Sequence, residues 1–110
     1  MPRLCFALDL KNDPNLIREY EIHHQKVWPE ILQSLKDAGI LQAEIYRTGA
    51  RLFMILETNE QFSFARKTLS DSVNPKVQEW ETLMWKYQQA LPHASQGEKW
   101  VKLERIFQFD

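Results

Sequence analysis

The stretch LQAEIYRTGARLFMILE, residues 41–57, decides the fold class of this protein. It holds two strand-like segments, 41–47 and 51–57, which are separated by a short segment containing Gly49. Two such segments joined by a glycine-containing turn predict an antiparallel β-hairpin. The second strand-like segment places apolar side chains on both of its faces: Leu52, Met54 and Leu56 on one, Phe53 and Ile55 on the other. A sheet that is apolar on both faces needs cover on both.

The chain before the hairpin predicts a strand followed by helix. Residues 3–10 alternate apolar and other side chains with a period of two, which is typical of a strand. A helix is expected over 12–25, with Asn12 or Asp13 as its cap and Pro14 at its first position. Pro29 should break this helix, because proline lacks a backbone N–H. The helix should restart there and end at Gly39.

The chain after the hairpin predicts two helices and a last strand. We expect a helix over 58–71, capped by Thr58 or Asn59, another over 74–91, and a strand over 99–109. The order β-α-β-β-α-β is the ferredoxin-like split pattern. We therefore predict one α+β domain over residues 1–110 with an antiparallel sheet. Because helices cover one face of such a sheet, we also predict a homodimer in which a second subunit covers the other, giving a dimeric α+β barrel.

Composition narrows the class of protein. The chain has 110 residues, 44% hydrophobic and 26% charged, which is typical of a globular protein. Its 14 basic and 15 acidic side chains nearly balance, which argues against a nucleic-acid partner. The first ten residues lack the design of a signal peptide, and no stretch is long and apolar enough to span a membrane. We therefore expect a cytoplasmic location and no membrane partner.

Tyr20, His24 and Trp28 follow one another at spacings of four, so a helix would place them in one column. The column is either the buried stripe of an amphipathic helix or the wall of a pocket. As a pocket wall it would supply an imidazole for acid–base chemistry, with a phenol and a flat indole beside it. His23 points about a quarter turn away, so the adjacent histidines do not match the usual metal-binding spacing. We expect no metal site.

The predicted helix 74–91 carries a second aromatic cluster. One stripe contains apolar side chains and reads as core contact: Val77, Trp80, Met84, Tyr87 and Leu91. Trp85 lies off this stripe, with Glu81 one turn before it. This pair belongs either to a subunit interface, where tryptophan is enriched, or to a stacking wall where Glu81 binds hydroxyl groups.

The spacing Tyr20-x-x-x-His24-x-x-x-Trp28-Pro29-Glu30, after a first strand, resembles the L-rhamnose mutarotase family. The resemblance continues through LKDAGI, through AEIYR with Tyr46, through RLFMILE and through the tryptophan-containing late helix. It implies a ferredoxin-like dimeric barrel. It also implies an isomerase that interconverts the α and β anomers of a 6-deoxy-L-hexopyranose without a cofactor.

The same resemblance implies roles for individual residues. His24 matches the family's proton donor, and Tyr20 matches a tyrosine that contacts the sugar. The expected substrate-binding residues are Trp28, Tyr46, Trp80, Glu81 and Trp85. The sequence departs from the family pattern at Ala43, where well-known members carry tyrosine, and at Glu81, where the second of two adjacent tryptophans is expected. These departures affect the sugar wall, so L-fucose competes with L-rhamnose as the expected substrate.

Two other classes of function fit the same fold. Cofactor-independent monooxygenases that oxidise flat aromatic substrates use a dimeric barrel, and the four tryptophans would suit their pocket. Incubation with a polyphenol would consume oxygen in that case. A non-catalytic dimer that binds a small ligand or a partner protein is the third possibility, and it would bind sugar without accelerating anomer exchange.

Overall fold

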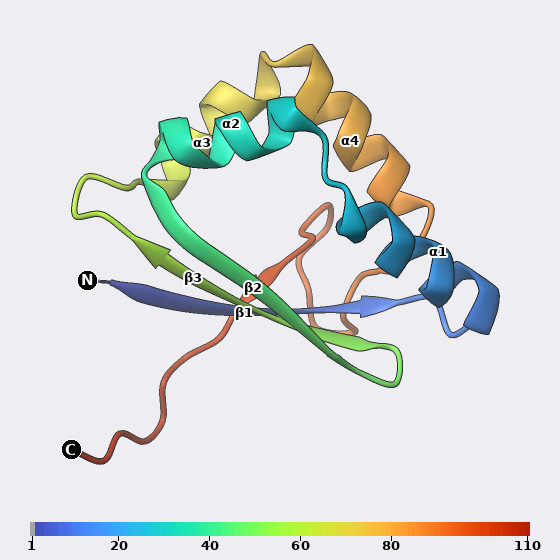
Figure 1. The fold of residues 1–110 in the computed structure, drawn as a ribbon. Coiled ribbons are helices and arrows are strands. Elements are labelled where there is room, and N and C mark those ends of the chain that lie inside the picture. Colours follow the sequence, from blue (N-terminus) through green and yellow to red (C-terminus); the bar gives the residue numbers. More distant parts are fainter. Residues whose placement is uncertain (1) are drawn as a thin grey trace.

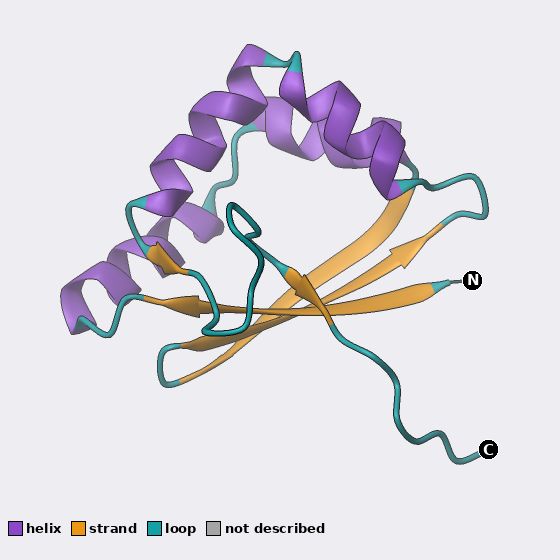
Figure 2. Cartoon of the chain, turned by 180° about the vertical axis from the view of Figure 1, so that it is seen from behind, coloured by secondary structure: helices purple, strands orange, loops and turns teal. Residues whose placement is uncertain are grey.

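The computed structural model describes residues 2–110 and consists of a sheet with helices on one of its faces (Figure 1, Figure 2). The strands lie in the order β2 (Ile40–Thr48), β3 (Arg51–Thr58), β1 (Arg3–Leu10) and β4 (Gln88–Gln89), and β5 (Val101–Lys102) also pairs with β1. All of these pairs are antiparallel. The helices are α1 (Pro14–Gln25), α2 (Pro29–Ala38), α3 (Phe64–Ser72) and α4 (Pro75–Trp85). The predicted ferredoxin-like α+β fold is confirmed.

Local signals fix the two helices that precede the hairpin. The Asp13 carboxylate caps α1 by accepting hydrogen bonds from two backbone N–H groups of the first turn. The first helix ends before Pro29, which begins α2. Gly39 ends α2 in the left-handed conformation, with φ of 92°, which a residue without Cβ adopts at little cost. These boundaries agree with the sequence prediction.

The strand register separates the side chains into two faces. Leu8 pairs with Leu52, and both are almost fully buried beneath the helices. Their neighbours in sequence, Ala7 and Phe53, pair on the opposite face and are only half-buried. Within residues 2–110 no helix covers that face, which we call the open face. The predicted distribution of apolar side chains over both faces is therefore confirmed.

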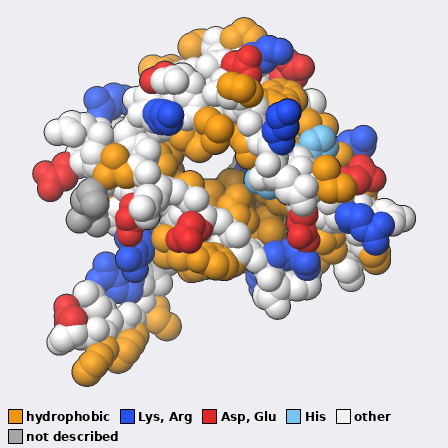
Figure 3. Space-filling model, in the orientation of Figure 1, with side chains coloured by type: hydrophobic (Ala, Val, Ile, Leu, Met, Phe, Trp, Pro, Cys, Tyr) orange, Lys and Arg blue, Asp and Glu red, His pale blue; other side chains and the backbone are white. Residues whose placement is uncertain are grey.

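The predicted strand over 99–109 is wrong in length. Only Val101–Lys102 pairs with β1, and residues 103–110 extend away from the body of the molecule (Figure 1). Hydrophobic side chains are exposed along this tail, including Ile106, Phe107 and Phe109 (Figure 3). The Leu103 N–H still donates to the Cys5 carbonyl of β1, and within residues 2–110 no strand pairs with the chain that follows. Without a neighbouring strand to satisfy its backbone groups, that segment does not continue the strand.

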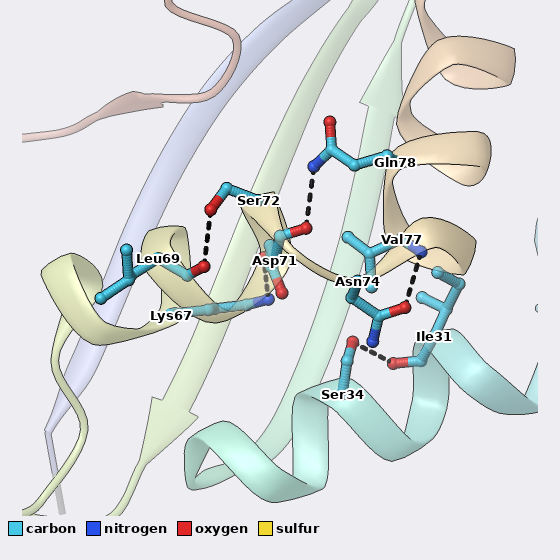
Figure 4. A network of polar contacts seen from close by, with 9 residues as sticks. All are labelled: Ile31, Ser34, Lys67, Leu69, Asp71, Ser72, Asn74, Val77 and Gln78. Carbon is cyan, nitrogen blue, oxygen red and sulfur yellow. Dashed lines mark hydrogen bonds and ion pairs between the residues drawn. The ribbon is translucent and has the colours of Figure 1, made fainter.

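The predicted helix over 58–71 begins later than expected. Thr58 ends β3 opposite Ile40, and the Asn59 N–H donates to the Gly39 carbonyl, so neither residue caps a helix. Ser63 is the cap of α3 instead. The connection to α4 is polar (Figure 4): Asn74 caps α4, and Gln78 reaches back to the Asp71 carbonyl.

The predicted helix over 74–91 ends early, at Trp85. The Tyr87 carbonyl accepts from the Lys11 N–H, and Gln88 and Gln89 pair with the end of β1. Competition from this strand edge explains the early end, because backbone groups that join a sheet cannot continue a helix. The predicted apolar stripe is nevertheless buried, from Val77 through Leu91.

No helix among residues 2–110 is long and apolar enough to cross a membrane.

Candidate active site

The column predicted from the sequence is present and is completed by α4. Tyr20 and His24 stack on α1 with ring centroids 4.4 Å apart. Trp28 follows at the start of α2, and its indole lies 5.1 Å from that of Trp80. Trp80 also meets His24 edge-on at 5.6 Å. The indole of Trp80 therefore joins the members of the column, and the structure brings these four predicted site residues together.

His24 is held in one tautomer. Its Nδ1 lies 2.9 Å from the backbone carbonyl oxygen of Tyr20. A carbonyl accepts and cannot donate, so the neutral ring carries its proton on Nδ1 and leaves Nε2 unprotonated, as an acceptor. Burial lowers the pKa of His24 from its ordinary value, although the hydrogen bond to Tyr20 partly opposes this effect. The ring is thus a neutral base at physiological pH.

Tyr20 supplies a protonated group, in contrast to the basic nitrogen of His24. It is 3% exposed, and burial raises the pKa of its hydroxyl to about 12. The hydroxyl oxygen accepts a hydrogen bond of 3.4 Å from Nε2 of Gln88. Because the phenol stays protonated at neutral pH, it is a hydrogen-bond donor beside the basic ring of His24.

Three residues that the sequence analysis did not assign to the site form a hydrogen-bonded chain beside it. Nε2 of His23 lies 3.1 Å from the Tyr87 hydroxyl, which donates to the Glu19 carboxylate at 3.2 Å. Glu19 and His23 are four residues apart on α1, and that spacing was a readable signal. Tyr87 lies more than sixty residues away along the chain, and no local pattern predicts that it meets them.

A hollow separates the sheet from the helices in Figure 3, and hydrophobic and histidine side chains gather around it. The edge strand β2 turns Ala43, Ile45 and Arg47 toward the helix-covered side, as their pairing with β3 shows. These side chains are exposed. Nε of Arg47 contacts the Glu21 carboxylate at 2.8 Å and so links β2 to α1.

The remaining predicted substrate-binding residues lie apart from the column. Tyr46 pairs with Phe53, which puts it on the open face, where its hydroxyl donates to Glu44. Glu81 and Trp85 adjoin Lys99 instead: the ammonium group lies 5.0 Å from the Trp85 ring centroid and 3.5 Å from the Glu81 carbonyl oxygen. The structure therefore does not bring Tyr46, Glu81 or Trp85 into contact with His24.

Potential metal ligands do not cluster in the described chain: residues 2–110 contain no group of three histidine, cysteine, aspartate or glutamate side chains arranged to hold a metal ion. The rings of His23 and His24 both pack against the indole of Trp80. The prediction that the protein has no metal site remains a prediction.

Comparisons with known proteins agree with this geometry. The family model described as L-rhamnose mutarotase matches residues 3–109. An L-fucose mutarotase from Xanthomonas campestris is 47% identical over 97% of this chain and 87% of its own. The crystal structure of an L-rhamnose mutarotase from Formosa agariphila aligns with a TM-score of 0.73 at 23% identity and covers all of both chains.

A dimeric ferredoxin-like protein from an uncultured marine organism aligns with a TM-score of 0.60 at 15% identity over 99% of both chains. These two structural likenesses show the fold, whereas the family model and the Xanthomonas relative show the family. The chain is a member of the L-rhamnose mutarotase family.

Proposed function

We propose that this protein is a cofactor-independent sugar mutarotase, an isomerase that interconverts the α and β anomers of a 6-deoxy-L-hexopyranose. Membership of the L-rhamnose mutarotase family supports this function. The observation that carries it is the state of His24, whose Nδ1–H donates to the Tyr20 carbonyl, so that Nε2 is the unprotonated nitrogen of the neutral ring. A neutral imidazole with one free nitrogen is suited to take and return a proton at neutral pH.

Mutarotation needs two proton transfers of opposite sense. One group removes the proton of the anomeric hydroxyl while another gives a proton to the ring oxygen, and the bond between C1 and the ring oxygen breaks. The open aldehyde then rotates about the bond between C1 and C2, and the reverse transfers close the ring. Acid–base help of this kind contributes roughly 10²- to 10⁴-fold in rate.

We assign the role of proton acceptor and donor to Nε2 of His24. Tyr20 assists as a hydrogen-bond donor, because burial keeps its hydroxyl protonated. Trp28 and Trp80 form the apolar wall against which C–H groups of a sugar would pack. We leave Tyr46 out of this site because its strand position faces the other way.

We further propose L-fucose as the preferred sugar. The 47% identity to a protein named as an L-fucose mutarotase supports this choice. Saturation-transfer NMR on the anomeric protons of L-fucose and L-rhamnose tests both proposals. Faster exchange of L-fucose is expected; if the protein accelerates neither sugar, the proposed function is wrong.

Glu81 is the candidate that the sequence offers for this choice between sugars, although it lies beside Lys99 and apart from the column. A carboxylate that binds ring hydroxyls discriminates stereochemistry more strongly than apolar contacts, which contribute only ~1–3 kcal/mol. Glu81→Gln keeps the shape and removes the charge, so it should slow exchange of the preferred sugar more than that of the other. An equal effect on both sugars, or none, would make Glu81 a surface residue without a role in recognition.

We also propose that the protein acts as a homodimer. Cys5, Phe53 and Ile55 give the open face an apolar character, and the tail at 103–110 exposes further hydrophobic side chains. The structural neighbour described as a dimeric ferredoxin-like protein supports this assembly. Light scattering at micromolar concentration should give the mass of two chains, and the mass of one chain would contradict the proposal. The cytoplasmic location remains a prediction from the sequence.

A further inference from the structure

We propose that Glu19, Tyr87 and His23 form a positioning network that fixes the orientation of the catalytic ring of His24. The inference rests on the mutarotase function proposed above. It concerns residues outside the proposed sugar site: none of the three belongs to the column of Tyr20, His24 and Trp28.

The hydrogen bonds of the network have a single consistent direction. A phenol has one proton, and the Tyr87 hydroxyl donates it to the Glu19 carboxylate at 3.2 Å. The hydroxyl oxygen is then an acceptor for His23, whose Nε2 lies 3.1 Å away. His23 must therefore carry a proton on Nε2. Neutral His24 carries its proton on Nδ1 instead, so the adjacent rings are held as opposite tautomers.

The network acts on His24 through Trp80. The His23 ring meets the Trp80 indole at 6.5 Å with an interplanar angle of 87°. The His24 ring meets the same indole at 5.6 Å. Trp80 is 8% exposed, so it has little room to move. A fixed His23 ring therefore restricts the indole, and the indole restricts the ring of His24.

Tyr87 is suited to hold this arrangement. The Tyr87 side chain is 2% exposed. Its ring centroid lies 5.5 Å from that of His23 and 6.3 Å from that of Tyr20. The Lys11 N–H holds the Tyr87 backbone through its carbonyl. The phenol is thus anchored between the sheet and α1, and its hydroxyl is the link between an exposed carboxylate and a ring next to the site.

The test compares Tyr87→Phe and Glu19→Gln with the parent protein. Long-range ¹H–¹⁵N NMR of the imidazole rings reports which nitrogen carries the proton. We expect Nε2–H for His23 and Nδ1–H for His24 in the parent, and a mixture of tautomers for His23 in Tyr87→Phe. In that variant kcat should fall roughly threefold to tenfold, the equivalent of one ordinary hydrogen bond, with KM close to that of the parent.

Glu19→Gln should cause a smaller loss of kcat, because its amide oxygen still accepts a hydrogen bond but without a charge. Since Glu19 is exposed, this variant remains informative if Tyr87→Phe folds poorly. The matched control is Tyr46→Phe, which removes a comparable hydrogen bond of 3.0 Å to Glu44 on the open face. Its histidine spectra should match those of the parent.

Two results would overturn the inference. One is a parent spectrum with His23 protonated on Nδ1. The other is a pair of network variants that lower the melting temperature and leave kcat unchanged, which is the behaviour of a merely structural contact. A parent protein that accelerates no anomer exchange would remove the proposed function and the catalytic role together, whereas the spectra decide separately whether the network exists.

Discussion

The two faces of the sheet resemble each other in sequence and differ in what covers them. On the helix-covered face Leu8, Leu52 and Leu56 are 0%, 1% and 4% exposed. On the open face Phe53 and Ile55 are only half-buried, although they alternate with Leu52 and Leu56 along β3. The covered face meets the aromatic column, and the open face is available for a second subunit. Neighbouring residues on β3 therefore lie in different surroundings.

The largest expected effect separates these faces directly. Leu56→Glu would bury an unpaired carboxylate beneath the helices, at a cost of several kcal/mol that is comparable to the whole stability of a small domain. Ile55→Glu places the same charge on the open face, so this variant should fold as a monomer. Circular dichroism measures folding and light scattering measures mass. If both variants unfold, or both remain dimeric, the distinction between the faces is wrong.

The next effect concerns catalysis on the covered face. His24→Ala removes the proposed proton acceptor and should slow anomer exchange about tenfold or more, while the protein stays folded. His23→Ala, which removes a positioning residue, should cost less. Saturation-transfer NMR provides both rates. Equal losses would mean that the position of His24 in the column has no special role.

A smaller effect should appear in the pH profile. Burial lowers the pKa of His24 below 6.5, so its neutral, basic form persists into mildly acidic solution. The exchange rate should therefore hold through neutral pH and fall only as the pH drops below about 6.5. Stability should fall in the same direction, because protonation of a ring with a depressed pKa favours the unfolded chain. A rate that shows no fall at any acidic pH at which the protein stays folded would exclude His24 as the titrating base.

The smallest expected effect concerns whether a second subunit shields the open face from a reagent in solution. Cys5 pairs with Ile55 across β1 and β3 and shares that face with it. If a second subunit covers the face, maleimide should label Cys5 more slowly in the parent than in the monomeric Ile55→Glu variant. The labelling rate is followed by mass spectrometry. Identical rates in both proteins would show that Cys5 is equally accessible with and without a partner.

The sequence by itself determined the parts of this protein that depend on a few neighbouring residues. Asp13, Pro29 and Gly39 set helix boundaries through side-chain caps, a missing N–H and a left-handed φ, and all of these act within one turn. The period of two along β1 and β3 and the column of Tyr20 and His24 were readable for the same reason. The family resemblance and the fold class could both be predicted from such local patterns.

Only the tertiary structure decided what depends on distant partners. The late helix stops at Trp85 because the residues that follow pair with the end of β1. The last strand is only two residues long because, after the Leu103 N–H bonds to Cys5, residues 104–110 pair with no strand of the described chain. Tyr46 falls on the open face through its pairing with Phe53, and Tyr87 reaches His23 across the molecule. Hydrogen bonds and packing between remote segments compete with local preference, and the sequence pattern of one segment does not reveal which partner it will meet.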